Sequence, residues 1–595
     1  NICTTKYKKQ FTKMKGRIIF TMKLKKVVSL LCVFTMAVSL VTGCGKGQTQ
    51  TSAPEPTKQT EQDTGKKEET NEKTGTSCQD LGTPLADVRV RQALAYAIDM
   101  KTIVETLFAG KAEVAKSFTA PGDWLNAGIP TYEYNPEKAK ELLKEADWPK
   151  DYTLDVVYYY DDQQTVDLMT IIGQYWSEVG VKAQFRKLEG DLAAQLWVPP
   201  TDRVNGPSEV KWDLAYAAVA ALTESEFYNR FSSNASNNSS VPKQDALDQL
   251  IIQSNSTMDT EVQKKVFGEI QQYVAENVLA LPLYHQVCFI YTSKDLDTAG
   301  IKFGNDQFSY DKHILDWKIN RDDKTLYTNG GPQEFFWYPM VNPGYMINTE
   351  LVFDKLINAD ENLNPTDGML AESYNVEDTS IEFILREGLK WHDGESLTAE
   401  DVKFTIELML KTPGTNAVAS EVMKAIVGAQ DFIDGKTQSL EGVVVDGNKV
   451  TVNFATVSAN ALQVFAQWPI LPKHCLEKTD PTVLQQDPFW QKPIGSGPFM
   501  VDEVVLNNYA TLKRWDGYYK TGTGNIEKIH MFASGENDAN LVKNAGAGKI
   551  DYAWSKSTDD AKAIEAMDNM NVTVANIRYT RCFYMNQFPH TPNIK

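Results

Sequence analysis

The sequence is poor in cysteine, in basic charge and in long apolar runs. Its 595 residues include only 7 Cys, too few for a fold built on disulfides. The 60 Lys and Arg are outnumbered by 78 Asp and Glu, and the net charge of −18 argues against a broad nucleic-acid-binding face. Beyond residue 41 no apolar run reaches the ~18 residues of a transmembrane helix. Hydrophobic residues still make up 42% of the chain, which is typical of a globular protein of about three or four domains.

Catalytic and metal-binding motifs are also scarce. The 6 His include no i,i+4 pair and no HExxH motif, so we expect no metal and no cofactor. His392-Asp393 is interpreted as a turn before a capped helix rather than as an acid–base pair. Asn544–Lys549 lacks the spacing of a phosphate-binding loop, and there is no GxSxG motif. We therefore do not expect the protein to be an enzyme. A glycosidase with two catalytic carboxylates is the enzymatic alternative left open.

The N-terminal region has the pattern of a bacterial secretory signal. Met22 is a better start than Asn1, and three lysines between residues 23 and 26 precede the apolar run Val27–Val41. The next residues, Thr42-Gly43-Cys44, complete a motif that resembles a lipobox, in which the cysteine is lipidated. We expect residues 1–43 to be an upstream segment with a lipoprotein signal peptide, and Cys44 to carry the lipid.

Residues 44–83 are expected to be a flexible tether. From Gly45 to about Ser77 the sequence is rich in Thr, Gln, Glu, Lys, Gly and Pro and has no aromatic residue. Such a segment cannot bury enough apolar surface to fold. The sequence thus places the protein on the outer face of the cell membrane, anchored by lipid on the periplasmic or cell-wall side.

Beyond the tether, helical and strand patterns alternate. Leu154–Tyr160 and Val181–Leu188 are typical of strands, and Thr165–Glu178 between them is typical of a helix, which favours an α/β domain. In the second half, Thr398 and Asp401 resemble a capping box, and strand patterns predominate. The predicted fold class is α/β with α+β elements.

Several segments together resemble one protein family. They are DVRVRQALAYAID (87–99), YNPEKAKELLKEA (134–146), LAESYNV (370–376), LREGLKWHDGESLTAEDVKFTIE (385–407), PIGSGPFMV (493–501) and AGKIDYAW (547–554). They resemble signature segments of the bacterial extracellular solute-binding proteins, family 5, the dipeptide- and oligopeptide-binding lipoproteins of ABC importers. The resemblance covers nearly all of residues 84–595.

The order of these segments differs from that of the family. There the HDG and TAEDV segments come first and DVRVRQAL comes later, whereas here DVRVRQAL lies at residue 87 and HDG at residue 392. The usual family C-terminus, about Asp316–Asn320, is joined through Arg321-Asp322 to the usual mature start at Lys324. This order predicts a circular permutation; a misassembled gene would give the same sequence.

The resemblance implies a two-lobed periplasmic-binding-protein-like fold of type II with a third, inserted subdomain. One lobe would comprise residues 84–283 and the other residues 284–365 and 471–595, with the subdomain at residues 366–470. Two strands, about Leu281–Ile290 and Arg581–Asn586, would cross the hinge. Cys288 and Cys582 fall on these two strands, so a disulfide between them is one option.

The resemblance also points to ligand-binding residues. In the oligopeptide-binding relatives an Asp at the end of one strand pairs with the ligand's α-ammonium; the corresponding stretch here, Trp212–Leu222, ends in Leu222. Glu224 could replace that Asp. Aromatic residues near the expected cleft offer stacking surfaces, which leaves a neutral oligosaccharide as an alternative ligand. The expected ligand-binding residues are Asn329, Trp337, Trp468, Gly495, Gly497, Ala218, Glu224 and Asn586.

The sequence therefore predicts a substrate-binding subunit of an ABC importer that captures short peptides and delivers them to the permease subunits. It is expected to be a monomer, attached to the membrane by its lipid and without a nucleic-acid partner. A sensory lipoprotein that binds a ligand for a signalling pathway is the alternative outside transport.

Overall fold

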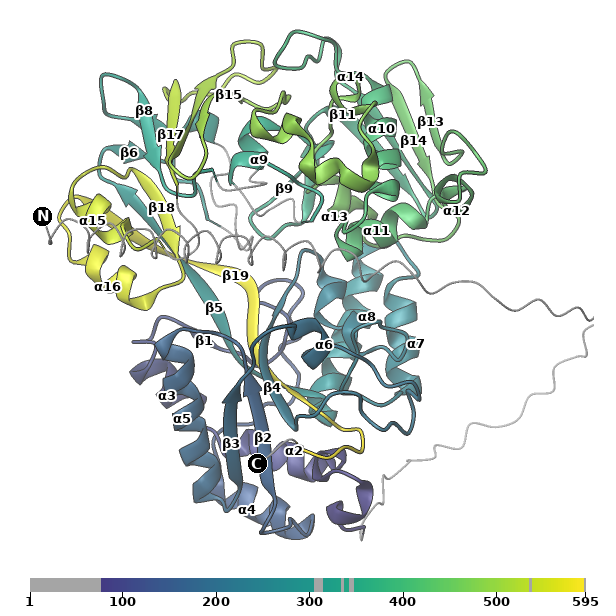
Figure 1. Ribbon diagram of the computed structural model, residues 1–595, viewed down its shortest axis with the longest axis vertical. Coiled ribbons are helices and arrows are strands. Elements are labelled where there is room, and N and C mark those ends of the chain that lie inside the picture. Colours follow the sequence, from purple (N-terminus) through teal and green to yellow (C-terminus); the bar gives the residue numbers. More distant parts are fainter. Residues whose placement is uncertain (1–75, 304–313, 333–336, 342–346, 534–537, 593–595) are drawn as a thin grey trace, which may run out of the picture. The chain divides into compact units, whose positions relative to one another are not determined.

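The computed structural model describes residues 76–303, 314–332, 337–341, 347–533 and 538–592 (Figure 1). All of these residues belong to one compact unit, Lys73–Lys595. Cys44, the predicted lipidation site, lies outside the described residues. Within the described part of the chain, no helix has both the length and the apolar character needed to cross a membrane.

A large mixed sheet is the main element of the fold. Its strands follow the order β15-β16-β17-β8-β18-β5-β19-β4-β2-β3, and β1 pairs with β5. The bounds are β1 Glu113–Val114, β2 Thr153–Tyr158, β3 Lys182–Lys187, β4 Leu214–Ala220, β5 Ala280–Ser293, β8 Thr325–Thr328, β15 Phe499–Val505, β16 Tyr509–Arg514, β17 Lys528–Phe532, β18 Tyr552–Ser555 and β19 Met570–Met585. The predicted α/β class is confirmed.

Helices pack on the β2–β3–β4 part of this sheet and enclose two hydrophobic cores. One core contains Trp176, Tyr216 and Phe583, and the other contains Trp212, Phe227 and Tyr584. The helices of this lobe are α2 Val88–Tyr96, α3 Met100–Thr106, α4 Pro136–Glu145, α5 Gln163–Glu178, α6 Leu192–Leu196, α7 Asp245–Ser254 and α8 Thr260–Asn277.

The second lobe holds a larger core and a separate four-stranded antiparallel sheet, β11-β12-β14-β13. The core includes the buried Trp317, Trp391 and Trp490. The strands here are β6 Leu296–Asp297, β7 Lys318–Ile319, β9 Ile357–Ala359, β10 Pro365–Gly368, β11 Ala371–Glu377, β12 Ser380–Leu385, β13 Val443–Asp446 and β14 Lys449–Asn453. The helices are α9 Ile347–Val352, α10 Ala399–Lys411, α11 Ala417–Lys424, α12 Ala429–Ile433, α13 Ala461–Phe465, α14 Lys473–Leu476, α15 Leu541–Gly546 and α16 Thr558–Glu565.

Helix starts follow the caps that the sequence contains. The Asn135 side chain accepts a hydrogen bond from the Lys138 amide, and Pro136 occupies the first turn of α4. Thr398 and Asp401 form the predicted capping box of α10. Asp99 caps α3, so α2 and α3 are two separate helices.

Two long antiparallel strands, β5 and β19, connect the cores of the two lobes (Figure 1). Leu283 of β5 and Phe583 of β19 lie in one core, whereas Ile290 and Ala575 of the same strands lie in the large core of the other lobe. These are the two crossing strands expected from the sequence. Their register shifts between Asn576 and Thr580, where β19 is irregular.

The register also separates the two hinge cysteines. Cys288 lies opposite Ala575, and Cys582 lies opposite Pro282, six positions away along β5. A disulfide needs Cα atoms about 4.4–6.8 Å apart, which neighbouring strands allow only for residues close to one another in register. Both cysteines are buried thiols, and the disulfide considered from the sequence is not formed.

Candidate ligand-binding site

Glu224 is buried and already carries an internal counter-charge. It lies in the short helix η3 (Glu224–Phe227) with 8% of its surface exposed, and forms an ion pair with Arg578 of β19, which is also buried. Arg578 additionally donates to the Asn362 carbonyl at 2.6 Å. Burial raises the pKa of Glu224, and the charge and hydrogen bond of Arg578 oppose that rise. The Glu224 carboxylate, which the sequence suggested as the partner of a ligand ammonium group, is thus paired with the Arg578 guanidinium of the protein itself.

Asn329, Trp337 and Trp468 are all buried in the second lobe. Asn329 directly follows β8, and its Oδ1 atom has no hydrogen-bond partner among the described residues. Trp337 and Trp468 lie in the large hydrophobic core, with 1% and 4% of their surfaces exposed. Among these three residues, Asn329 Oδ1 and Trp468 Nε1 are buried polar atoms without a hydrogen-bond partner in the described part of the chain, and a ligand could satisfy either of them.

Gly495 and Gly497 pack against the backbone of Leu351 and Val352. A Cβ atom on Gly495 would lie 1.8 Å from the Val352 carbonyl oxygen, and one on Gly497 would lie 2.5 Å from the Leu351 carbonyl oxygen. His392 joins the two glycines: its Nδ1 accepts from the Gly495 amide at 3.1 Å, and its Nε2 donates to the Gly497 carbonyl at 2.9 Å. Burial lowers the pKa of His392 to about 4, so the ring is neutral at pH 7. These contacts make the segment a close-packed backbone unit.

Ala218 and Asn586 flank the crossing strands. Ala218 is half-buried in β4, opposite Arg581 of β19. Asn586 follows β19 and is fully buried; its side chain donates to the Ser208 hydroxyl and to the Trp212 carbonyl, both at 3.1 Å. Ala218 therefore lies next to Arg581 in the sheet, whereas Asn586 fixes the chain at the end of the sheet.

A cavity of about 400 Å³ lies where β5 and β19 pass between the lobes. Its lining comes from the end of β2 and the start of α5, from the two crossing strands, and from the segment between β18 and α16; it includes Tyr160, Gln164, Gln286, Lys556, Tyr579 and Arg581. Sequence analysis did not single out Arg581 or its tyrosines. The run Tyr158-Tyr159-Tyr160 before a capped helix was the signal that could have drawn attention to them.

The tyrosines around Arg581 are hydrogen-bonded to one another. The Tyr216 and Tyr284 hydroxyls are 2.9 Å apart, and the Tyr159 and Tyr160 hydroxyls are 3.0 Å apart. Burial raises the pKa of Tyr160 and of Tyr216 well above 10. These hydroxyls are therefore protonated at pH 7 and can donate to or accept from a ligand, but they contribute no negative charge.

A second, larger cavity of about 530 Å³ lies inside the first lobe. Its lining includes Ile98, Phe118, Tyr132 and Leu283, and is mainly apolar. The smaller cavity combines aromatic faces, a guanidinium and an amide, and draws its lining from both lobes, which is the combination typical of a specific ligand site.

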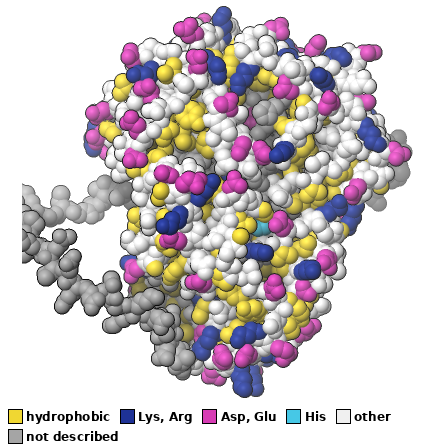
Figure 2. Space-filling model, turned by 180° about the vertical axis from the view of Figure 1, so that it is seen from behind, with side chains coloured by type: hydrophobic (Ala, Val, Ile, Leu, Met, Phe, Trp, Pro, Cys, Tyr) yellow, Lys and Arg dark blue, Asp and Glu magenta, His cyan; other side chains and the backbone are white. Residues whose placement is uncertain are grey.

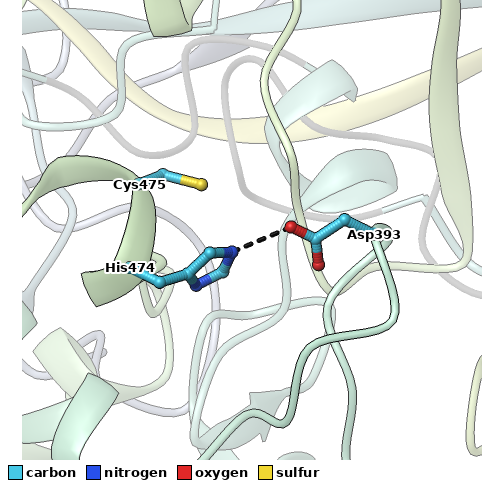
Figure 3. Close-up of side chains that lie close together, drawn as sticks. All are labelled: Asp393, His474 and Cys475. Carbon is cyan, nitrogen blue, oxygen red and sulfur yellow. Dashed lines mark hydrogen bonds and ion pairs between the residues drawn. The ribbon is translucent and has the colours of Figure 1, made fainter.

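Among the described residues, Asp393, His474 and Cys475 form one group that could together hold a metal ion (Figure 3). Their ligand atoms lie within 4.8 Å of one another, and His474 Nε2 is 2.9 Å from Asp393 Oδ2. Burial raises the pKa of the Cys475 thiol to about 11, helped by Asp393 and Asp401. Structural zinc sites take four ligands including deprotonated thiols, and this group offers three. Asp393 also stabilises the turn before α10, because its side chain accepts a hydrogen bond from the Glu395 amide.

Comparison with known proteins places the chain in a family. The profile of the bacterial extracellular solute-binding proteins, family 5 Middle, matches residues 46–238 and 366–592, more than half of the chain. The protein belongs to this family, and the resemblance found in the sequence is confirmed.

Curated relatives match smaller segments. Oligopeptide-binding protein AppA of Bacillus subtilis is 30% identical over 228 residues, 37% of this chain and 38% of its own. The dipeptide-binding protein of Escherichia coli is 37% identical over 106 residues, 17% of this chain and 20% of its own. Heme-binding protein A of Haemophilus influenzae is 36% identical over 129 residues, 19% of this chain and 24% of its own. The chain thus matches well under half the length of each of these relatives.

Proposed function

We propose that this protein is the extracytoplasmic substrate-binding lipoprotein of an ABC importer, and that it captures short peptides between its two lobes for delivery to the permease. Membership of the solute-binding family 5 carries this proposal. The cavity beside β5 and β19 supports it, because strands that connect two lobes are where a closing motion would enclose a ligand. Relatives named for oligopeptide and dipeptide binding favour peptides over sugars.

The proposal includes an anchor on the outer face of the membrane through lipid at Cys44, with no catalytic step. Figure 2 shows acidic and basic side chains interspersed over the face of the molecule in view, without a broad basic surface. Because the segment around Cys44 is outside the described residues, the anchor is tested chemically. Globomycin, which blocks the lipoprotein signal peptidase, should cause the unprocessed precursor to accumulate, and a Cys44→Ala variant should incorporate no radiolabelled palmitate.

We also propose that the chain carries the family's elements in permuted order. Pro589, near the end of the described chain, packs on Gly82 just before α2, and Ser208 donates its amide hydrogen to the Pro589 carbonyl at 2.9 Å. The segments expected to be continuous in the family therefore lie side by side in this protein. Closeness of such ends is the condition under which permutation preserves a fold.

A thermal-shift screen tests the function. The full chain with Cys44→Ala is stripped of bound ligand by reversible unfolding, refolded and heated with peptides of two to five residues or with matched oligosaccharides. Peptides should raise the melting temperature by several degrees, because a ligand that binds only the folded state stabilises it. A rise with oligosaccharides alone, or with neither, would overturn the peptide proposal.

A further inference from the structure

We propose that Arg581 binds a carboxylate group of the ligand in the cavity beside Tyr160. This inference rests on the proposed function and deepens it, because it assigns the charge that the site recognises. The sequence suggested that Glu224 would meet a positive ligand group, whereas the cavity presents a positive protein group.

The guanidinium of Arg581 is held in a fixed position by aromatic rings. Its Cζ atom lies 3.8 Å from the centroid of the Tyr160 ring and 5.0 Å from that of Tyr579, distances at which cation–π attraction operates. Its Nε donates to Gln286 Oε1 at 3.3 Å. A planar guanidinium fixed in this way is preorganised to offer its outer N–H groups to a carboxylate in a bidentate contact.

Part of that donor capacity is unused. Arg581 Nη1 is buried and makes no hydrogen bond with any described residue. Arg581 also forms no ion pair within the described chain, although the comparably buried Arg578 pairs with Glu224. Burying a cation without a partner costs several kcal/mol, and buried donors are nearly always satisfied. A ligand anion would remove both costs.

The carboxylates that line the cavity have other partners. Asp162 caps α5 by accepting from the Thr165 amide and hydroxyl, at 2.8 and 2.9 Å. Asp161 pairs with Lys187, and the side chain of Asp559 is 96% exposed and lies 3.9 Å from Lys562. None of them pairs with Arg581.

A second cation, Lys556, lies beside one of the aromatic rings that contact Arg581. Lys556 Nζ lies 5.0 Å from the centroid of the Tyr579 ring, the same distance as Arg581 Cζ. The two basic side chains thus share one aromatic ring at the cavity wall. The neighbouring tyrosines are protonated at pH 7, so their hydroxyls do not offset the charge of these two cations.

Calorimetric titration of stripped, refolded protein tests the assignment with four tripeptides. Ala-Ala-Ala and its C-terminal amide differ in the α-carboxylate, and Ala-Glu-Ala amide and Ala-Gln-Ala amide differ in a side-chain carboxylate. Removing the carboxylate that Arg581 binds should weaken binding at least tenfold, and the pair that shows the loss identifies its source. Arg581→Gln should abolish the difference, and Arg581→Lys should restore part of it.

Arg230→Gln is the matched control, since Arg230 also stacks on aromatic rings, 4.8 Å from the Trp197 centroid, but does not line the cavity. It should retain the wild-type preference. Equal binding of acid and amide peptides, or an unchanged preference in Arg581→Gln, would overturn the inference while leaving peptide binding intact. If no peptide binds but succinate stabilises the wild type and not Arg581→Gln, the anion site stands and the peptide function fails.

Discussion

The guanidinium of Arg321 donates two hydrogen bonds, of 2.7 and 2.8 Å, to the carboxylate of Asp551. Asp551 is 1% exposed and also accepts from the Tyr327 amide. Arg321 lies in the segment where the sequence suggests that two family ends are joined. The joint is therefore attached to the large sheet by a bidentate ion pair in which the carboxylate is buried and the guanidinium is 26% exposed.

Arg321→Gln should lower the free energy of unfolding by about 3–5 kcal/mol, because it leaves a buried carboxylate without its counter-charge. Urea denaturation followed by tryptophan fluorescence measures the loss. Lys436→Gln is the control, since Lys436 pairs with Asp431 at a fully exposed site and should change stability far less. Equal small effects for both variants would contradict a structural role for the Arg321–Asp551 pair.

The Glu224–Arg578 pair should behave as a coupled unit. Glu224→Leu or Arg578→Met alone should destabilise the protein by about 3–5 kcal/mol, because each leaves an unpaired buried charge. The double variant should recover most of that loss. A double-mutant cycle on unfolding free energies gives the coupling; additive losses would show that the two charges do not depend on one another.

Gly495→Ala should prevent or severely weaken folding, by more than about 3 kcal/mol, because the added Cβ would overlap the Val352 carbonyl oxygen. Gly447 is the contrast: its φ is +61°, and a Cβ there would meet nothing within 4 Å. Gly447→Ala should therefore cost only about 1 kcal/mol of backbone strain. Soluble yield and melting temperature compare the two, and a mild Gly495→Ala effect would contradict the close packing of this segment.

Stability should fall as the pH is lowered from 7 toward 4. Burial lowers the pKa of both His285 and His392 from 6.5 to about 4. Below pH 6.5 the unfolded chain binds protons that the folded protein does not, which favours unfolding by up to about 3 kcal/mol per histidine near pH 4. Urea midpoints at pH 7.5, 5.5 and 4.5 should show a shallower decline for His392→Asn than for the wild type. Parallel declines would rule out His392 as a contributor.

The sequence predicted the local elements well where a cap or a strict period marks them. The capping box at Thr398 and the two crossing strands are examples. It could not reveal the partners of buried charges, because those depend on contacts between distant segments. Arg578 and Glu224 are 354 residues apart in sequence, and nothing near Glu224 indicates that its charge is already paired.

The same limit applies to the site. The motif match drew attention to Gly495 and Gly497, and the structure shows the close backbone packing that requires glycine there. Arg581 belongs to no motif quoted from the sequence. Its surroundings are assembled from β2, β5 and β19, so only the folded chain brings the guanidinium and its tyrosines together.

Peptide capture is best tested by native mass spectrometry of the full chain with Cys44→Ala, purified without denaturation. The folded protein should carry a co-purified mass that fragments as a short peptide bearing a free carboxylate. Arg581→Gln should lose this mass while keeping a folded charge-state distribution. A retained hexose series, or folded protein that is empty and stays empty when peptides are added, would contradict the account.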